Sequence, residues 1–166
     1  MDDLIVRLIR PGDSLEDLMR LLHRAYKVLA DAGYNYTATD QDVETTRRRI
    51  EKLICYVALL GDRLVGTIGV DVSTDRKHTT RPGAAYVSQF AVDPEMQGAG
   101  IGRRLLERAQ KRATQAGLTE IALDTAEGAA DLISFYERQG YAPVGHVQWE
   151  GKTYRSVVMA RKLSAD

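Results

Sequence analysis

Three closely spaced glycines lie where an apolar, strand-like run passes into a helix-like run. The segment reads Gln97-Gly98-Ala99-Gly100-Ile101-Gly102, and it separates Ala85–Val92 from a helical pattern that ends near Gln115. Each glycine costs roughly 0.5–1 kcal/mol relative to alanine inside a helix, so a bare backbone must serve a purpose here. The first N–H groups of a helix lack intrahelical partners and carry partial positive charge, which predicts an anion site, in particular for a pyrophosphate.

The spacing differs from that of two other phosphate-binding loops. A G-x-x-x-x-G-K-[ST] loop would place a lysine and a hydroxyl after its last glycine, but Arg103 and Arg104 follow Gly102. A dinucleotide-binding fold would need G-x-G-x-x-G in an early strand–helix–strand unit. Here the glycine spacing is different and the segment lies late in the chain, although Asp124 follows it at a suitable distance.

The pattern Q-x-x-G-x-G after a strand resembles the acyl-CoA loop of the GNAT superfamily of N-acyltransferases. Val87–Glu95 resembles that superfamily's fourth strand with its V-x-P-x-x-Q-G connection, Ile121–Asp124 its fifth strand, and Ala129–Tyr141 the helix that follows. The resemblance implies an α/β (α+β) fold with a mixed, mostly antiparallel sheet of about seven strands and about four helices. It also implies that the fourth and fifth strands splay apart.

By this resemblance acetyl-CoA is the co-substrate. The amides of Gln97–Arg103 would take the pyrophosphate, and the backbone around Phe90 and Val92 would hold the pantetheine arm and polarise the thioester carbonyl. Ala129 stands where the family commonly has an asparagine that contacts CoA, which suggests weaker or rearranged binding. The predicted cofactor-binding residues are Phe90, Ala91, Val92, Gln97, Gly98, Ala99, Gly100, Ile101, Gly102 and Arg103.

Acyl transfer from a thioester to an amine needs an uncharged amine, charge stabilisation at the tetrahedral centre and a proton for the departing thiolate. The resemblance assigns the proton donor to Tyr136, in the pair Phe135-Tyr136. The alternative is that Tyr136 is a core aromatic residue, because it lies one helical turn after Leu132 on the same face.

The general base is open. Strand alternation places four side chains on one face of the fourth strand: Tyr86, Ser88, Phe90 and Val92. Tyr86 or Ser88 could hold a water that relays the proton to Asp124 or Glu127, or the enzyme could bind the small neutral fraction of the amine. Asp124 could equally be a strand-end cap and Glu127 a solvated loop acid. His23, His78 and His146 are interpreted as structural or solvated.

Alternating strand and helix patterns extend over nearly the whole chain. Leu4–Ile9 predicts a strand, followed by a helix that is capped at Asp13 or Ser14 and ends by Gly33. Gly33–Thr39 is expected to be a loop, Asp42–Leu53 a helix, and Cys55–Leu60 with Leu64–Val70 a hairpin around Gly61-Asp62. Val72–Ala84 predicts a long, mobile connection, and Val144–Trp149 with Thr153–Ala160 a closing hairpin.

Some side chains can be placed on these elements. Arg47–Arg49 are expected on a solvated helix face, because helical geometry spreads the three side chains widely. Trp149 and Tyr154 are interpreted either as specificity residues near the acceptor or as a cross-strand aromatic pair. The helix after the glycines should bury Ile101, Leu105, Leu106, Ala109 and Ala113.

Composition sets the outer bounds. With 166 residues, 44% of them hydrophobic, the chain has the size of one domain over 1–166. Lysine and arginine equal aspartate and glutamate at 23 each, so no net field favours nucleic acid or a membrane. The apolar runs are too short to span a bilayer and Met1-Asp2-Asp3 is not a basic signal start, so a cytoplasmic protein is expected. Cys55, the only cysteine, is expected in the core, which leaves no cysteine metal site.

The prediction from sequence is therefore an acetyl-CoA-dependent N-acetyltransferase without a metal. Its acceptor would be a primary amine of a small molecule or of a peptide or protein, attacked directly in a ternary complex. A non-catalytic acyl-CoA-binding sensor and an interaction domain are the alternatives. The acceptor is not identified, and a homodimer is one option for the oligomeric state.

Overall fold

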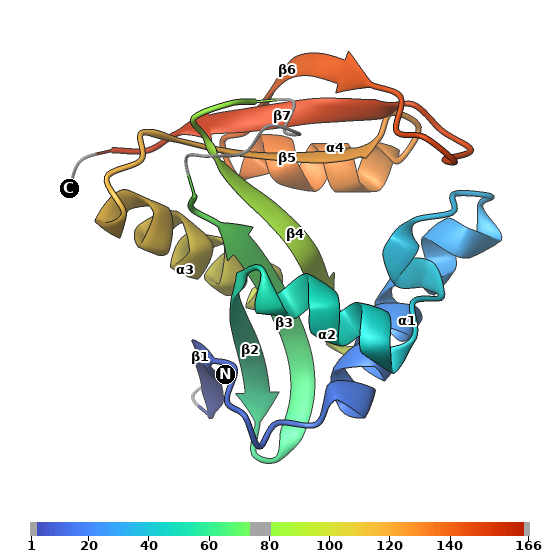
Figure 1. Ribbon diagram of the computed structural model, residues 1–166, viewed down its shortest axis with the longest axis vertical. Coiled ribbons are helices and arrows are strands. Elements are labelled where there is room, and N and C mark those ends of the chain that lie inside the picture. Colours follow the sequence, from blue (N-terminus) through green and yellow to red (C-terminus); the bar gives the residue numbers. More distant parts are fainter. Residues whose placement is uncertain (1–2, 74–80, 165–166) are drawn as a thin grey trace.

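A seven-stranded sheet organises the computed structural model, which describes residues 3–73 and 81–164 (Figure 1). The strands are β1 (Leu4–Leu8), β2 (Ile54–Leu60), β3 (Arg63–Asp71), β4 (Ala85–Val92), β5 (Glu120–Ala126), β6 (Ala142–Val147) and β7 (Ser156–Lys162). The helices are α1 (Leu15–Asp31), α2 (Val43–Glu51), α3 (Ile101–Gln115) and α4 (Ala130–Arg138). Short 3₁₀ turns cover Thr37–Thr39 and Pro94–Met96. The predicted fold class is confirmed.

The sheet opens in its middle. Its strand order is β1-β2-β3-β4-β5-β7-β6, and β4 and β5 form a parallel pair while the other described pairs are antiparallel. The parallel pair joins only Ala85 to Ile121 and Tyr86 to Ala122. Beyond Tyr86 the two strands diverge, so that β1–β4 and β5–β7 form the two arms of a V in Figure 1.

Two helices lie on each side of the sheet. The main core contains the predicted inward face of α3, with Ile101, Leu105, Leu106, Ala109 and Ala113 all buried, together with Tyr136 of α4. A second cluster on the opposite side joins Leu18 and Leu22 of α1 to Ala91 of β4. Cys55 is buried as expected, and burial raises the pKa of its thiol.

Caps set the starts of the first two helices. Ser14 is the N-cap of α1, since its hydroxyl accepts from the Asp17 amide at 3.1 Å, whereas Asp13 pairs with Arg7. Asp42 caps α2 in the same way by accepting from the Thr45 amide at 2.7 Å. Among the described helices, none is long and apolar enough to cross a bilayer.

A β-bulge changes the predicted faces of β4. Ser88 pairs with Gly69 and Ala91 with Thr67, so Gln89 and Phe90 together oppose a single residue of β3. Gln89 has a φ of 53°, which is rare for a residue other than glycine. The expected common face is therefore wrong: Phe90 and Val92 pack on the α3 side, while Tyr86 packs with Ala122 in a different cluster.

The strands of the C-terminal hairpin are shifted from their predicted positions, and their connection is longer than predicted. β6 ends at Val147 and β7 starts at Ser156, and β7 lies between β5 and β6. Trp149 and Tyr154 thus fall in the connection and do not form a cross-strand pair. Nε1 of Trp149 donates a hydrogen bond to the Asp124 carboxylate, and the Tyr154 ring stacks on the Tyr36 ring.

The Gly33–Thr39 loop and the arginines of α2 differ in part from their predictions. The Gly33–Thr39 loop is irregular as expected, apart from its single 3₁₀ turn, but Ala38 within it is buried. Arg47 and Arg48 are exposed, whereas Arg49 is half-buried and faces β4, so the expectation of a solvated face fails for that residue. Most of the predicted Val72–Ala84 connection, including His78, lies outside the described residues.

Candidate active site

The divergence of β4 and β5 creates a cleft of about 530 Å³. Its walls come from α1, β4, the glycine loop, α3, β5 and α4. Nine of the ten predicted cofactor-binding residues line it: Phe90, Ala91, Val92, Gln97, Gly98, Gly100, Ile101, Gly102 and Arg103. Ala99 is the one that does not.

The glycine loop presents bare amides at the start of α3. Gly98 and Gly100 have φ values of 84° and 83°, in the left-handed region, and a Cβ on either would project into open space. The first intrahelical bond runs from the Arg104 amide to the Gly100 carbonyl oxygen at 3.1 Å. The amides of Ile101, Gly102 and Arg103 therefore have no intrahelical acceptor and are available to an anion.

Gly102 serves a different purpose from the other two glycines. It lies within the first turn of α3, where a Cβ would be 3.3 Å from Cζ of Phe135 and 3.5 Å from Cζ of Phe90. Its small size thus lets α3 approach the aromatic wall of the cleft. Two cations, Arg103 and Arg138, line the same cleft. Arg138, in the last turn of α4, was not singled out from the sequence, because a basic residue at a helix end is ordinary.

The edge of β4 that faces the gap has free hydrogen-bonding capacity. The Asp93 amide donates to the Val65 carbonyl oxygen at 2.8 Å, so in this antiparallel ladder the polar groups of Phe90 and Val92 point away from β3. The Tyr26 hydroxyl donates to the Phe90 carbonyl oxygen at 3.0 Å. From the sequence, helical periodicity predicts only that Tyr26 lies on the apolar face of its helix, and it does not show which group the phenol hydroxyl reaches.

Tyr136 lies in the aromatic wall with its hydroxyl unpaired. The residue is 8% exposed and its ring contacts those of Phe90, Phe135 and Tyr141. The hydroxyl makes no hydrogen bond to any residue that the structure describes. Burial, followed by the nearby tyrosines, raises the pKa of Tyr136 well above its ordinary value, so the phenol keeps its proton.

Asp124 stands at the fork between the two strands. It lines the cleft, one oxygen accepts from the Tyr86 hydroxyl, and the other accepts from Nε1 of Trp149 at 3.0 Å. Tyr86 belongs to the last paired position of β4, so this contact spans the point where β4 and β5 separate. Two groups named from the sequence, Tyr86 and Asp124, are thus brought together.

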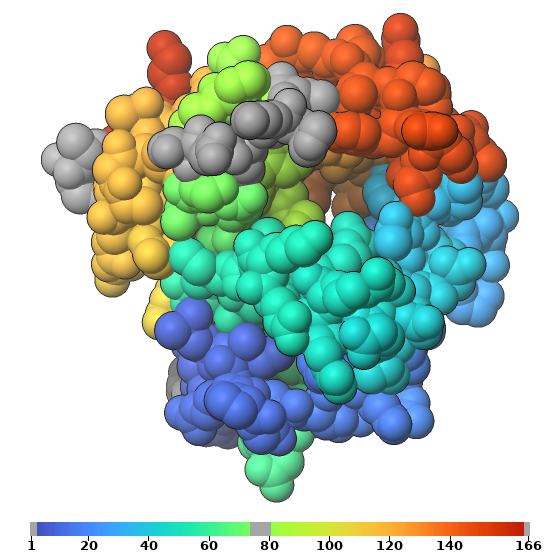
Figure 2. All heavy atoms as spheres, in the orientation of Figure 1, coloured from blue at the N-terminus to red at the C-terminus, as the bar shows by residue number. Residues whose placement is uncertain are grey.

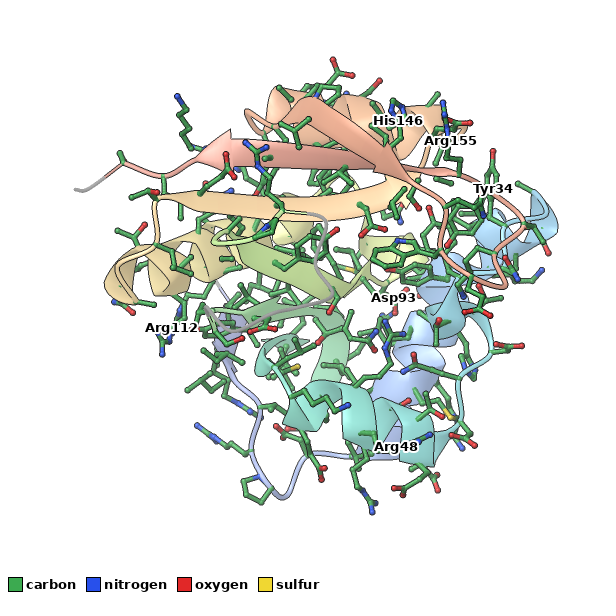
Figure 3. All side chains as sticks on the ribbon, turned by 45° about the horizontal axis from the view of Figure 1, so that its top comes forward. Tyr34, Arg48, Asp93, Arg112, His146 and Arg155 are labelled. Carbon is green, nitrogen blue, oxygen red and sulfur yellow. The ribbon has the colours of Figure 1, made fainter. Side chains whose placement is uncertain are left out.

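Ser88 and Glu127 are not brought to the cleft. Glu127 lies past the end of β5, where its carboxylate accepts from Nε of Arg155 at 2.9 Å and is 3.9 Å from Nε2 of His146. Figure 3 shows Arg155 and His146 side by side at this outer corner. Ser88 follows Tyr86 on β4 but is not among the residues that line the cleft.

Aromatic side chains from distant segments meet at the rim on the β5 side. The Tyr36 hydroxyl lies 2.7 Å from Oγ1 of Thr125, a cleft residue, and accepts from the Ala126 amide at 2.7 Å. The Tyr154 ring stacks on Tyr36 with a centroid distance of 4.8 Å. These contacts tie the Gly33–Thr39 loop to the β6–β7 connection, and Figure 2 shows the surface hollowed between that connection and α2.

These residues fit an acyl-CoA. Helix-start amides and two arginines suit a pyrophosphate, and a strand edge with free polar groups suits an extended amide-bearing arm. In the described part of the chain no group of three or more side chains is arranged to hold a metal ion.

Comparison with known proteins gives the family. A model of the acetyltransferase (GNAT) family matches residues 15–141. The chain belongs to the GNAT acetyltransferase family. Among GNAT relatives, S-(2-succino)cysteine N-acetyltransferase of Bacillus subtilis (strain 168) is 31% identical over 153 residues, covering 91% of this chain and 92% of its own. S-alkylcysteine N-acetyltransferase of the same organism is 26% identical over 144 residues, covering 85% and 80%.

Solved structures share the GNAT fold. A GNAT family acetyltransferase from Elizabethkingia anophelis, crystallised with acetyl-CoA bound, superposes with a TM-score of 0.72. The match covers 98% of this chain and 100% of that one at 14% identity. At this identity the likeness concerns the fold alone.

Proposed function

We propose that this GNAT protein is an acetyl-CoA-dependent N-acetyltransferase, which moves an acetyl group to a primary amine of a small molecule or of a peptide or protein. The observation that carries the proposal is the cleft at the β4–β5 fork. Its lining includes the helix-start amides of α3, the Tyr136 phenol, which makes no hydrogen bond within the described residues, and the Asp124 carboxylate.

Binding of acetyl-CoA would use the backbone more than side chains. The amides of Ile101, Gly102 and Arg103 would hold the pyrophosphate, with Arg103 and Arg138 adding charge. The free edge of β4 at Phe90 and Val92 would hold the pantetheine arm. An amide on that edge would stabilise the oxyanion that develops on the thioester carbonyl.

The acetyl transfer would proceed by direct attack. The amine lone pair forms the new C–N bond at the thioester carbonyl carbon, and the C–S bond breaks with its electron pair going to sulfur. Tyr136 would supply a proton to this thiolate, and the nitrogen loses a proton to a base, which leaves neutral amide and thiol. In water a phenol donates to a thiolate uphill by about 2 kcal/mol, and because a dry site raises the pKa of Tyr136 as well as that of the thiol, the difference shrinks only where the thiol pKa rises more.

Asp124, assisted by Tyr86, would be the group that accepts the amine proton. Its carboxylate lies in the cleft and is oriented by the Tyr86 hydroxyl and the Trp149 indole. Glu127 is held at the surface by Arg155, which makes it the weaker candidate.

S-substituted cysteines are the first acceptors to test, because two relatives are named for acetylating such compounds. Purified protein would be incubated with acetyl-CoA and S-benzyl-L-cysteine, and thiol release and the N-acetyl product would be followed. A broader amine and peptide panel would follow. Tight CoA binding without turnover of any amine would favour the alternative, a non-catalytic acyl-CoA sensor.

A further inference from the structure

The inner face of α2 carries a cation that the proposed acetyl transfer does not use. Arg49 is half-buried, and its Nη1 donates to Oε1 of Gln41 at 2.9 Å. With the Gln89 amide oriented so that its oxygen faces the guanidinium, that oxygen accepts from Nη1, Nη2 and Nε at 2.8, 3.0 and 3.1 Å. Both partners are neutral side chains.

Arg49 therefore has no carboxylate partner in the part of the chain that the structure describes. Within the described residues it forms no ion pair, whereas Arg7 pairs with Asp13 and Arg81 with Glu120. Burial lowers the pKa of Arg49, the direction expected for a cation that has lost water without gaining an anion. A half-buried charge whose partners are all neutral is less well compensated than an ion pair, which favours an anionic ligand.

The hydrogen bonds of Arg49 go to only two amide oxygens, and most of them share one. Three guanidinium nitrogens converge on one amide oxygen, which has two lone pairs and cannot align with all of them. A guanidinium presents a planar fork of N–H groups that matches the two oxygens of a carboxylate. The group that would complete this site is a carboxylate.

The position of Arg49 connects it with the reacting centre. Gln89 is the bulge residue of β4, and its strained φ of 53° directs its side chain to Arg49. The next residue, Phe90, accepts from Tyr26 at the edge of the cleft. Tyr26 and Tyr154 are the two tyrosines close enough to Arg49 to interact with it electrostatically. In Figure 2 the surface hollow lies between α2 and the β6–β7 connection that holds Tyr154.

We propose that Arg49 binds a carboxylate of the acceptor, so that the substrate is a small molecule carrying both an amine and a carboxylate. This rests on the proposed acetyltransferase function and narrows its acceptor class. Asp124 on β5 would receive the amine, and Arg49 on the α2 side would hold the carboxylate. The internal amide that follows the N-terminal amine of a protein would leave Arg49 unpaired, which disfavours protein acceptors.

The test uses three acceptors that differ only in the carboxylate: S-benzyl-L-cysteine, its carboxamide, and S-benzylcysteamine. Values of kcat/KM would be taken on the alkaline plateau of each acceptor, because the three amines differ in basicity. The variants are Arg49→Gln, Arg49→Lys and, as matched control, Arg48→Gln. Arg48 lies on the same helix and points away from the body of the protein in Figure 3.

The wild type should prefer the carboxylate acceptor by about 10- to 100-fold, the usual value of a charge-assisted pair. Arg49→Gln should lose that preference and change the other two acceptors little, while Arg49→Lys should keep part of it. Arg48→Gln should stay within about twofold for all three. A wild type that does not discriminate overturns the proposal without any variant, as does an equal loss on all three acceptors in Arg49→Gln.

Calorimetry separates this proposal from the proposed function. N-acetyl-S-benzyl-L-cysteine would be titrated into the CoA-bound protein, wild type and Arg49→Gln. Arg49-dependent binding with no turnover of any acceptor would refute the acetyltransferase and keep the carboxylate site. Turnover without dependence on the carboxylate would do the reverse, and neither turnover nor binding would refute both.

Discussion

The Tyr136 ring is buried, but its hydroxyl opens into the cleft and makes no hydrogen bond within the described residues. Side-chain polar groups in the interior are almost always hydrogen-bonded, because leaving one unsatisfied costs about 1–3 kcal/mol. Tyr136 instead points its hydroxyl into the cleft among apolar rings. Core packing accounts for the ring but not for the hydroxyl, which supports the role of proton donor.

Tyr136→Phe should lower kcat by about 10² to 10⁴-fold, the usual worth of a positioned proton donor. Because the hydroxyl makes no hydrogen bond within the described residues, the melting temperature and the affinity for acetyl-CoA should hardly change. Steady-state kinetics under chemistry-limited conditions and a thermal melt would measure both.

Tyr141→Phe is the matched control. Tyr141 contacts the Tyr136 ring, but its hydroxyl accepts from Nε2 of Gln110 at 2.9 Å and it does not line the cleft. This variant should lose about 1 kcal/mol of unfolding free energy and keep its turnover. If both variants kept full turnover, Tyr136 would be a packing residue.

The variants Asp124→Asn and Glu127→Gln should differ in how kcat/KM depends on pH. The acceptor must lose a proton, so kcat/KM should rise with pH. The raised pKa of Tyr136 keeps the phenol protonated, so activity should not fall again below about pH 10. Asp124→Asn should reduce the plateau by about 10² to 10⁴-fold, and Glu127→Gln should stay within about twofold.

Rates measured from pH 6 to pH 10 with acceptors of different basicity would check this. Asparagine keeps an oxygen for the Trp149 indole, so the folded state should be little disturbed. If the alkaline plateau of kcat/KM were unchanged in Asp124→Asn, Asp124 would not be the base. If the rising part of the pH profile shifted in Glu127→Gln, Glu127 would be the base.

At the level of elements, the two ends of α3 offer a test of the phosphate loop. Gly100 before the helix and Gly117 after it have nearly the same φ, 83° and 82°, and neither has an atom within 4 Å of a Cβ. Alanine at either position should therefore cost about 1–2 kcal/mol of stability through the left-handed backbone alone. Only Gly100→Ala should also weaken CoA binding, by about tenfold or more, because its methyl group would enter the phosphate site.

Isothermal titration with CoA on both variants would measure the difference, with denaturant melts to confirm the equal strain. Equal affinities in the two folded variants would contradict a phosphate site at this loop. Gly102→Ala is less informative, since its methyl group would press on Phe135.

The elements themselves were largely predictable. Hydrophobic periodicity and turn glycines predicted the strands and helices up to α3 within one or two residues, because local sequence dominates there, and the family resemblance predicted β5. The β4 bulge was not predictable, since no local pattern marks Gln89, and with it the faces of Phe90 and Val92 were inverted. The closing hairpin was misplaced because long-range contacts, Trp149 to Asp124 and Tyr154 to Tyr36, hold its connection.

The site was predictable only in part for a similar reason. The glycine loop and Tyr136 lie in contiguous motifs that sequence displays. Tyr26 and Arg49 come from α1 and α2 and reach β4 only through the tertiary fold. A run of three arginines looks like a solvated face until the fold shows which one turns inward.

On the scale of the whole molecule, the sheet is held together least well between β4 and β5. The antiparallel pairs on both sides of the fork join five or more residues of each strand, but β4 and β5 are joined at two positions. The cleft residues come from both arms, so an acyl-CoA bound there would bridge them. The bound ligand would then add contacts between the two arms, which few backbone hydrogen bonds connect at this point.

Acetyl-CoA at 100 times its dissociation constant should therefore raise the unfolding free energy by about 2.7 kcal/mol, or the melting temperature by about 5–10 °C. Hydrogen exchange would locate the effect. The amides of Phe90 and Val92 point into the gap, so local opening should expose them in the free protein and ligand should protect them. Amides of β2, paired on both edges by β1 and β3, should change only as far as global stability changes. Protection of β2 and β4 by the same factor would mean that the arms do not open separately, and no protection at all would mean that acetyl-CoA does not bind at the fork.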